Sequence, residues 1–355
     1  MNPILSNNYY VNFKEDAYTK LNKYISSSKP STIFILVDEN TGNDCLPLLL
    51  EQLETEQPIE IIEIEAGEVN KNLDTCSGVW NALTELGADR KSLMLNLGGG
   101  VITDLGGFVA STFKRGISFV NIPTTLLSMV DASVGGKTGV DLGVLKNQIG
   151  LFSDPEMVVI DPIYLETVSQ RELRSGLAEI IKYGLTYDIK VWNDINNFKE
   201  FNISDLSSLI HRSIEIKNEV VTKDPKEAGI RKVLNFGHTL GHAIESCFLE
   251  SEDKENLTHG EAIAIGMITE TYISEALLGF PSEALKNIKQ LIINIYGKVQ
   301  IEIADYDAIL ELLIHDKKNV SGQVNFVLLT NFENYKLDCK VKKSLIIEAL
   351  NYYNS

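Results

Sequence analysis

Short aliphatic or β-branched runs recur through the first half of the chain, and longer stretches with helical periodicity separate them. Each run ends in turn-forming residues, a rhythm that is typical of a largely parallel β-sheet flanked by helices. The runs that we predict to be strands are Ser31–Asp38, Ile59–Glu65, Ser92–Leu97, Ser118–Ile122 and Glu156–Asp161. The sequence therefore predicts a Rossmann-like α/β domain over residues 1–162.

Beyond residue 162 the pattern changes to long amphipathic stretches, which predict helices. These stretches are Gln170–Tyr183, Ser204–Thr222, Asn235–Phe248, His259–Leu277, Ser282–Ile295 and Lys342–Tyr353, and Val324–Leu329 is an isolated strand pattern. We predict an all-α domain over residues 163–355 and a ligand cleft where the two halves meet. Two domains also suit a length of 355 residues, which exceeds what one compact core usually holds.

The charge balance limits the partners. A net charge of -17 argues against binding to nucleic acid or to an anionic membrane surface, both of which need basic patches. The first residues lack the apolar run of a signal peptide, and no apolar stretch is long enough to cross a bilayer. The four cysteines are scattered without CxxC pairing, so we expect a protein of the reducing cytoplasm.

A glycine triplet, Gly98-Gly99-Gly100, directly follows the third predicted strand and opens a helix that includes Val101 and Asp104. Glycines there let backbone amides approach a diphosphate. The spacing is not GxGxxG, so a tight turn without a ligand is an equally good interpretation. Further polar residues follow the predicted strands, where they could reach a ribose or adenine, although each alone is more often a helix cap or a solvated turn residue. They are Asp38, Asn40, Glu68, Lys71, Thr124 and Thr125.

Two segments with little regular periodicity, Asp131–Gly139 and Lys146–Gly150, are rich in glycine and lysine. An irregular stretch of this kind is usually functional or disordered, and we predict a functional loop. The spacing of a phosphate-binding P-loop is not met, which disfavours hydrolysis of nucleoside triphosphates. Four residues could together bind a phosphate monoester, unless they are simply solvated at the surface. They are Arg115, Lys137, Lys146 and Asn147.

Histidines gather in one short region. His238 and His242 stand four apart, so that they share a helix face, and His259 opens the next predicted helix. A lone pair at this spacing is more often packing than coordination, but the chain contains only five histidines. Glu179 and Lys182 form a charged pair on another, otherwise apolar helix face, which is costly unless it binds something. Together these residues predict a catalytic metal site of His and carboxylate ligands.

Taken together, the blocks Gly98–Gly107, Pro123–Gly150, Ser175–Gly184 and Arg231–Glu245 with His259 resemble 3-dehydroquinate synthase, a sugar-phosphate cyclase of the shikimate pathway. The resemblance extends from about Asp38 to about Lys318. It implies a dehydroquinate synthase-like fold, NAD and a divalent metal, zinc or cobalt, as cofactors, and a cytoplasmic homodimer.

The resemblance also implies a role for each matching position. Glu179, His238 and His259 would bind the metal, and His242 would handle protons one turn further on. The other catalytic or substrate-binding positions would be Asp131, Lys137, Lys182, Lys217, Arg231, Asn235 and Lys318. Arg115, supplied across the dimer, would bind the substrate phosphate together with Lys146 and Asn147. The NAD contacts would be Asp38, Asn40, Glu68, Lys71, Gly99, Gly100, Val101, Asp104, Thr124, Thr125, Lys137, Lys146, Thr167 and Glu172.

The implied reaction converts 3-deoxy-D-arabino-heptulosonate 7-phosphate to 3-dehydroquinate and phosphate. NAD oxidises the C5 hydroxyl transiently, phosphate leaves by β-elimination, C5 is reduced again, and an intramolecular aldol reaction closes the ring.

Three alternatives stay open at this stage. A cyclase that makes inosose or valiolone products would not need groups for a substrate carboxylate. A metal-dependent polyol dehydrogenase of the glycerol dehydrogenase type would form NADH from a neutral alcohol. A non-catalytic regulator would bind NAD without releasing phosphate.

Overall fold

The computed structural model describes residues 1–143, 145–197, 203–314 and 324–355. The chain falls into two compact units. Unit 1 comprises Met1–Gly143, Asn147–Leu173 and Asn202–Thr222, and unit 2 comprises Val144–Lys146, Arg174–Phe201 and Lys223–Ser355. Each unit is therefore assembled from separate segments of sequence, and the boundary at residue 162 stays a prediction.

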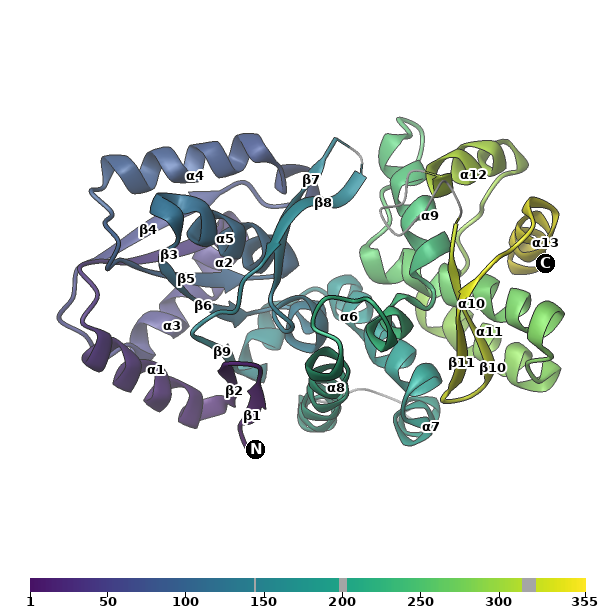
Figure 1. Cartoon of the computed structure of the whole chain (residues 1–355), viewed down its shortest axis with the longest axis horizontal. Helices are drawn as coiled ribbons and strands as arrows, with labels where there is room; N and C mark the ends of the chain where they lie inside the picture. The colour runs from purple at the N-terminus through teal and green to yellow at the C-terminus, as the bar shows by residue number, and fades with distance from the viewer. Residues whose placement is uncertain (144, 198–202, 315–323) are drawn as a thin grey trace. The chain divides into compact units, whose positions relative to one another are not determined.

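The centre of unit 1 is a sheet with the strand order β1-β2-β9-β6-β5-β3-β4 (Figure 1). Neighbouring strands run parallel from β2 to β4, and β1 pairs antiparallel with β2. The strands are β1 Ile4–Ser6, β2 Tyr9–Phe13, β3 Ile33–Asp38, β4 Ile59–Ile64, β5 Leu93–Gly98, β6 Ser118–Pro123 and β9 Met157–Ile160. Five of them match the predicted strands within two residues at each end. The short strands β1 and β2 were not predicted.

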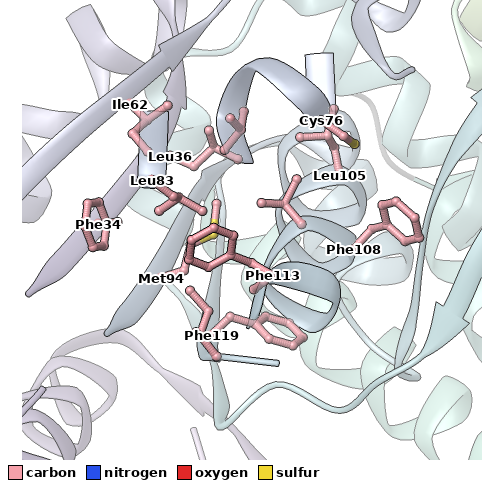
Figure 2. Packing of buried hydrophobic residues seen from close by; sticks show 14 of the residues in the cluster. Phe34, Leu36, Ile62, Cys76, Leu83, Met94, Leu105, Phe108, Phe113 and Phe119 are labelled. Atoms are coloured by element: carbon pink, nitrogen blue, oxygen red, sulfur yellow. The ribbon is translucent and has the colours of Figure 1, made fainter. Parts of the chain in front are cut away.

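The sheet is covered by helices because its inner strands are apolar on both faces. All residues from Ile33 to Val37 in β3 are buried, as expected for a parallel strand inside an α/β unit. The helices of unit 1 are α1 Lys14–Ser28, α2 Glu39–Asp44, α3 Leu46–Gln52, α4 Leu73–Glu85, α5 Gly100–Thr112 and α8 Ile203–Lys223. On one face, Phe34 and Leu36 of β3 belong to the hydrophobic cluster of Figure 2, which also contains side chains of helices α4 and α5.

Two glycines let helix α5 pack closely against its neighbours, Gly106 against strand β5 and Gly107 against Thr138. A Cβ atom on Gly106 would lie within 2.5 Å of Asn96, and one on Gly107 would lie 2.5 Å from the side chain of Thr138. Real Cβ atoms are essentially never found at such distances, so an alanine at either position would displace the contacted side chain or the helix. This close contact fixes the N-terminus of α5 at the carboxyl end of β5.

Helix α8 belongs to unit 1 although it follows two helices of unit 2 in the sequence. Asn218 donates a hydrogen bond to the backbone carbonyl of Leu5, and Nε2 of His211 lies 3.0 Å from the carbonyl oxygen of Asn2. Lys217 pairs with Asp131 at 2.8 Å. These contacts tie α8 to residues at and just before the first strand and to the π-helical turn Ser128–Ala132 after β6.

The segment that we predicted as a functional loop is in part a β-hairpin, which corrects that prediction. Strands β7 Lys137–Leu142 and β8 Leu145–Phe152 pair with each other in a separate two-stranded sheet. Its glycines concealed the strands from sequence patterns. Gly139 and Gly150 face each other so closely that a Cβ on Gly139 would lie 2.5 Å from the carbonyl oxygen of Ile149.

Unit 2 is built mainly of helices, and a second hairpin accompanies them (Figure 1). The helices are α6 Gln170–Thr186, whose first turn belongs to unit 1, α7 Ile189–Asn197, α9 His238–Glu250, α10 His259–Leu278, α11 Ser282–Tyr296, α12 Tyr306–Ile314 and α13 Lys343–Asn354. The hairpin consists of β10 Phe326–Asn331 and β11 Asn334–Cys339. The isolated strand pattern thus corresponds to β10, and an all-α description of this half needs that correction.

One helix start differs from the prediction. The sequence predicted a helix from Asn235, but α9 begins at His238, after a 3₁₀ helix over Ile230–Asn235. Gly237, with φ of 79°, separates the two because this left-handed conformation interrupts helical hydrogen bonding. His238 is therefore the first residue of α9. The start of α10 at His259 agrees with the prediction, and a capping box between Thr258 and Glu261 fixes it.

None of the helices within the described ranges is long and apolar enough to span a membrane. All four cysteines are buried free thiols, in line with the absence of disulfide pairing expected from their spacing.

Candidate active site

Three helices of unit 2 supply the predicted metal ligands. Glu179 lies on the buried face of α6, His238 opens α9 with His242 one turn later, and His259 opens α10. Each position follows from local sequence. Glu179 lies within the fully buried stretch Ser175–Thr186, and the two histidines open their helices, after Gly237 and the Thr258 cap respectively.

Glycines allow these helices to meet at backbone distance. A Cβ on Gly260 would lie 2.6 Å from the carbonyl carbon of Ser175 on α6, and even closer to two other atoms of that residue. A Cβ on Gly266 of α10 would lie 2.9 Å from the backbone nitrogen of Gly241 on α9. Larger residues would hold α10 away from α6 and α9. The glycines therefore make it possible for short side chains from three helices to converge.

The converging atoms have the spacing that a small cation requires. Oε1 of Glu179 lies 3.2 Å from Nε2 of His238 and 3.7 Å from Nε2 of His259. Bonds of ~2.1 Å to a tetrahedral zinc ion place its ligands about 3.4 Å apart. Imidazole nitrogens of His238, His242 and His259 also lie within 4.8 Å of one another.

A buried oxygen supports the same interpretation. Glu179 is fully buried, and its Oε1 accepts no hydrogen bond although two imidazole nitrogens are near. Buried carboxylate oxygens are rarely left without a partner. One carboxylate oxygen and two imidazole nitrogens are a usual ligand set for zinc and similar divalent cations, so the residues present fit a metal ion.

The charges around Glu179 favour its ionised form. Burial by itself would raise the pKa of this carboxyl, but the charges of Lys182 and His238 bring the pKa well below its usual value. Lys182, buried on the same helix face, donates a hydrogen bond to Oε2 of Glu179. An anionic Glu179 is the form that a metal ion binds.

Two acceptors orient the imidazole rings. Nδ1 of His238 lies 3.1 Å from the carbonyl oxygen of Phe236, and Nδ1 of His259 lies 3.3 Å from Oε2 of Glu245. With Nδ1 held in this way, Nε2 of each ring faces Glu179. Burial would lower the pKa of His259, but Glu179 and Glu245 raise it to about 10. Metal binding therefore has to displace a proton from His259.

Sequence reasoning missed Glu245 and Glu270. Glu245 stands seven residues after His238, so the helical repeat that linked the histidines also places it on their face. Burial would raise its pKa, but Lys146 and then His259 lower it to about 2. Glu270, fully buried on α10, accepts hydrogen bonds from the backbone N–H groups of Gly237 and Leu240. It thereby fixes the start of α9, which sequence patterns do not reveal.

In unit 1 the glycine triplet lies at the carboxyl end of β5, where α5 begins. The backbone N–H of Thr124, which follows β6, bonds to the carbonyl of Gly98, so Thr124 lies beside the triplet. Nζ of Lys71 lies 2.6 Å from Asp104 and 2.7 Å from Oδ1 of Asn147. Lys71, Asp104 and Asn147 are thus brought together with the nucleotide loop.

Lys71 is a buried cation among acidic groups. Burial would lower its pKa, but Asp104, Glu68 and Asp141 together raise it above the usual value. Burial raises the pKa of Asp104, and the nearby charge of Lys71 offsets this only in part. This group carries excess negative charge and therefore suits hydroxyl groups of a ligand better than a further anion.

Other predicted NAD residues have local structural partners. Asp38 caps α2 through the backbone N–H of Thr41, which is the cap that the sequence left open as an alternative. Thr125 accepts a hydrogen bond from the N–H of Ser128, and Thr167 donates to the carbonyl of Tyr164. Asn40 and Val101 lie in the first turns of α2 and α5, and Glu172 lies in that of α6.

The predicted anion-binding residues belong partly to unit 1 and partly to unit 2. Lys146 pairs with Glu245 in unit 2, where Arg231 also donates a hydrogen bond to the carbonyl of Pro225 and Asn235 donates one to Glu227. In unit 1, Lys217 pairs with Asp131, and Lys137 opens β7. Arg115 lies beyond the C-terminal end of α5, about 20 Å along that helix from the glycine triplet. Lys318 lies outside the described residues.

Known protein families account for most of the chain. The model of the 3-dehydroquinate synthase N-terminal region matches residues 61–175, and that of the 3-dehydroquinate synthase C-terminal region matches residues 176–319. The chain belongs to the 3-dehydroquinate synthase family. Membership confirms the activity expected from the sequence resemblance, that of a carbon–oxygen lyase in the shikimate pathway.

Full-length relatives carry the same family name. The 3-dehydroquinate synthase of Parabacteroides distasonis is 44% identical over 342 residues, which cover 96% of this chain and 96% of that protein. That of Leptospira interrogans is 38% identical over 335 residues, covering 93% of this chain and 91% of that protein.

Solved structures share the fold. A 2-deoxy-scyllo-inosose synthase, complexed with carbaglucose-6-phosphate, NAD⁺ and Co²⁺, is 25% identical with a TM-score of 0.84, and each chain is covered to 99%. A glycerol dehydrogenase from Schizosaccharomyces pombe is 14% identical with a TM-score of 0.66, covering 99% of this chain and 90% of that one. The predicted fold class is confirmed. Because the 3-dehydroquinate synthase fold is common to cyclases and dehydrogenases, it cannot by itself select a reaction.

Proposed function

We propose that this chain converts 3-deoxy-D-arabino-heptulosonate 7-phosphate to 3-dehydroquinate and inorganic phosphate, with NAD and one divalent metal ion as cofactors. The observation that carries the proposal is the convergence of Glu179, His238 and His259 from three helices, with a buried oxygen that lacks a hydrogen bond. Family membership supplies the substrate, which the geometry alone would not.

Glu179, His238 and His259 would hold the metal ion. When bound, the metal would act as a Lewis acid on the C5 hydroxyl, and NAD would accept and return the hydride of that carbon. Lys182 keeps Glu179 ionised, and its ammonium group would stabilise negative charge that develops on the C5 oxygen of a metal-bound substrate. We assign proton handling to His242, whose ring centroid lies 5.2 Å from that of His238.

The remaining residues would bind and orient the substrate. Arg231 and Asn235, on the 3₁₀ helix just before α9, supply a guanidinium and an amide for carboxylate and hydroxyl groups. Lys217 is nine-tenths buried beside Asp131, and this pair can exchange partners with a substrate hydroxyl. We assign related roles to Lys137 and Lys318. Fixed cations of this kind stabilise an anionic substrate without reorganisation.

We assign NAD binding to the glycine triplet, the start of α5 and the Lys71 cluster. The first-turn amides of α5 suit a diphosphate, and the acidic surroundings of Lys71 suit ribose hydroxyls. The same assignment covers Asp38, Asn40, Thr124, Thr125, Thr167 and Glu172.

We further propose a homodimer in the cytoplasm. The family resemblance supports the dimer, because it implies that Arg115 acts on the site of a second copy, and Arg115 lies after the C-terminal end of α5. A second copy could supply its Arg115 to the phosphate end of the site, where it would act together with Lys146 and Asn147 of this chain.

The decisive experiment is to measure inorganic phosphate released from the heptulosonate phosphate, with and without a chelator. We expect NAD-dependent release that the chelator abolishes and that added zinc or cobalt restores, without net formation of NADH. His238→Ala should lose the metal and nearly all turnover, whereas the control His211→Ala, in unit 1, should keep both.

Two results would contradict the proposal. Net NADH from a neutral alcohol would indicate a polyol dehydrogenase, and NAD binding without phosphate release would indicate a regulator. Normal metal content in His238→Ala would refute the ligand assignment.

A further inference from the structure

We propose that Glu245 is a positioning residue that fixes one metal ligand and one phosphate-binding lysine at the same time. Its two carboxylate oxygens have different partners. Oε2 lies 3.3 Å from Nδ1 of His259, and Oε1 lies 3.2 Å from Nζ of Lys146. The inference rests on the proposed function, because it concerns the same metal and the same substrate.

Two of the three side chains are almost completely buried, and the third is partly exposed. The side chains of Glu245 and Lys146 expose only 8% and 9% of their surface, and that of His259 exposes 26%. A buried charge that loses its partner is strongly destabilising, so separating Glu245 from Lys146 would cost free energy. Glu245 lies two turns after the start of α9, a helix whose first residues Glu270 fixes. Glu245 can therefore hold the side chains of His259 and Lys146 in fixed positions.

For His259, the contact selects which nitrogen faces the metal. An imidazole ring can rotate so that either nitrogen points inward. With Nδ1 held by Glu245, Nε2 lies 3.7 Å from Oε1 of Glu179, close to the separation expected for two ligands of one cation. Carboxylates in this position typically raise metal affinity 10- to 100-fold.

For Lys146, the contact holds the ammonium group beside the metal ligands before substrate arrives. A lysine on a free stem would lose considerable side-chain entropy on binding a phosphate. Glu245 reduces that loss, because Lys146 is already ordered. Removing the carboxylate should therefore weaken both metal binding and the binding of the substrate phosphate by Lys146. Removing Lys146 should leave His259 oriented.

The test uses Glu245→Gln, which keeps the size of the side chain and removes its charge. The matched control is Glu250→Gln, an exposed position on the same helix. The first readout needs no turnover. The dissociation constant for Zn²⁺ is measured on the metal-free protein by competition with a chromophoric chelator, and the visible spectrum of the Co²⁺ form reports the ligand geometry.

We expect Glu245→Gln to weaken Zn²⁺ binding by ~10- to 100-fold and to change the Co²⁺ spectrum. Glu250→Gln and Lys146→Met should stay within about threefold of the unmodified chain. Glu245→Asp should recover part of the affinity. With saturating metal, Glu245→Gln should still show a raised KM for the phosphorylated substrate.

Zinc affinity of Glu245→Gln equal to that of Glu250→Gln would overturn the inference. Loss of cooperative thermal unfolding in Glu245→Gln would also overturn it, because Glu245 would then be a structural residue of the core. Failure of the unmodified chain to bind zinc would instead refute the proposed function, so the two failures are distinguishable.

Discussion

Replacing Gly260 by alanine should destroy the metal site while leaving the protein folded. The added Cβ would lie 2.6 Å from the carbonyl carbon of Ser175, and ordinary contacts begin at 3.4 Å. The neighbouring atoms belong to the backbone of α6, which cannot rotate away as a side chain would. The first turn of α10 would therefore have to move from α6 by nearly 1 Å or more.

That displacement is large for a metal site and modest for a fold. Metal–ligand distances are held to within ~0.2 Å, and the moved residue is the immediate neighbour of His259. Overpacking of this kind costs ~1–3 kcal/mol of a total stability of ~5–15 kcal/mol. We therefore expect Zn²⁺ affinity to fall by more than ~100-fold, or ~3 kcal/mol, while the cooperative unfolding transition persists.

The assay compares metal content after dialysis, zinc affinity by chelator competition and the thermal unfolding of the metal-free protein. Gly78→Ala is the matched control, because Gly78 lies in α4 with open space around its Cβ position. That variant should keep its metal and gain up to ~1 kcal/mol of stability. A Gly260→Ala protein with normal zinc affinity would refute the idea that helix proximity sets the ligand geometry.

Two further predictions concern stability. Glu270→Ala leaves the N–H groups of Gly237 and Leu240 without their acceptor, so the free energy of unfolding in urea should fall by ~2–4 kcal/mol, and an unchanged urea midpoint would contradict this. The pKa of Asp224 is lowered from 3.8 because, against the effect of burial, it accepts backbone hydrogen bonds from Gly229, Arg231 and Ala228. Its ionised form therefore adds stability above pH ~4 that is lost as the pH falls through the lowered pKa. The advantage of the unmodified chain over Asp224→Asn, measured by urea unfolding, should disappear in strong acid, and a difference independent of pH would argue against it.

Periodicity predicted the framework of the fold well because buried parallel strands are continuous apolar runs. Strand β3, for example, is buried along almost its whole length and was found within two residues of its ends. The β7–β8 hairpin escaped because Gly139 and Gly150 pair through close backbone contact, which leaves no alternation of apolar and polar side chains. Sequence periodicity reflects which side chains are buried, whereas this hairpin depends on the absence of a side chain at its two glycines.

The metal ligands could be proposed from sequence because rare residue types recurred at helical spacing. Their convergence could not be derived, because it depends on contacts between α6, α9 and α10 that no local pattern contains. Glu270 illustrates the difference. It accepts a hydrogen bond from the backbone N–H of Gly237, which lies 33 residues earlier in the sequence. Glu245 could have been proposed, as it shares the helical repeat of His238, but a single glutamate at the end of the segment Arg231–Glu245 has no spacing pattern of its own that indicates a role.

The membership of α8 in unit 1 bears on how the protein is made. During synthesis the whole sheet, through β9, emerges before α8, and helices α6 and α7 of the other unit are translated in between. Until residue 223 has left the ribosome, the backbone carbonyls of Asn2 and Leu5 lack their side-chain partners and Asp131 lacks its lysine. A nascent chain ending near residue 162 is thus an incomplete folding unit, exposed to aggregation for as long as translation of the next sixty or so residues takes, on the order of several seconds.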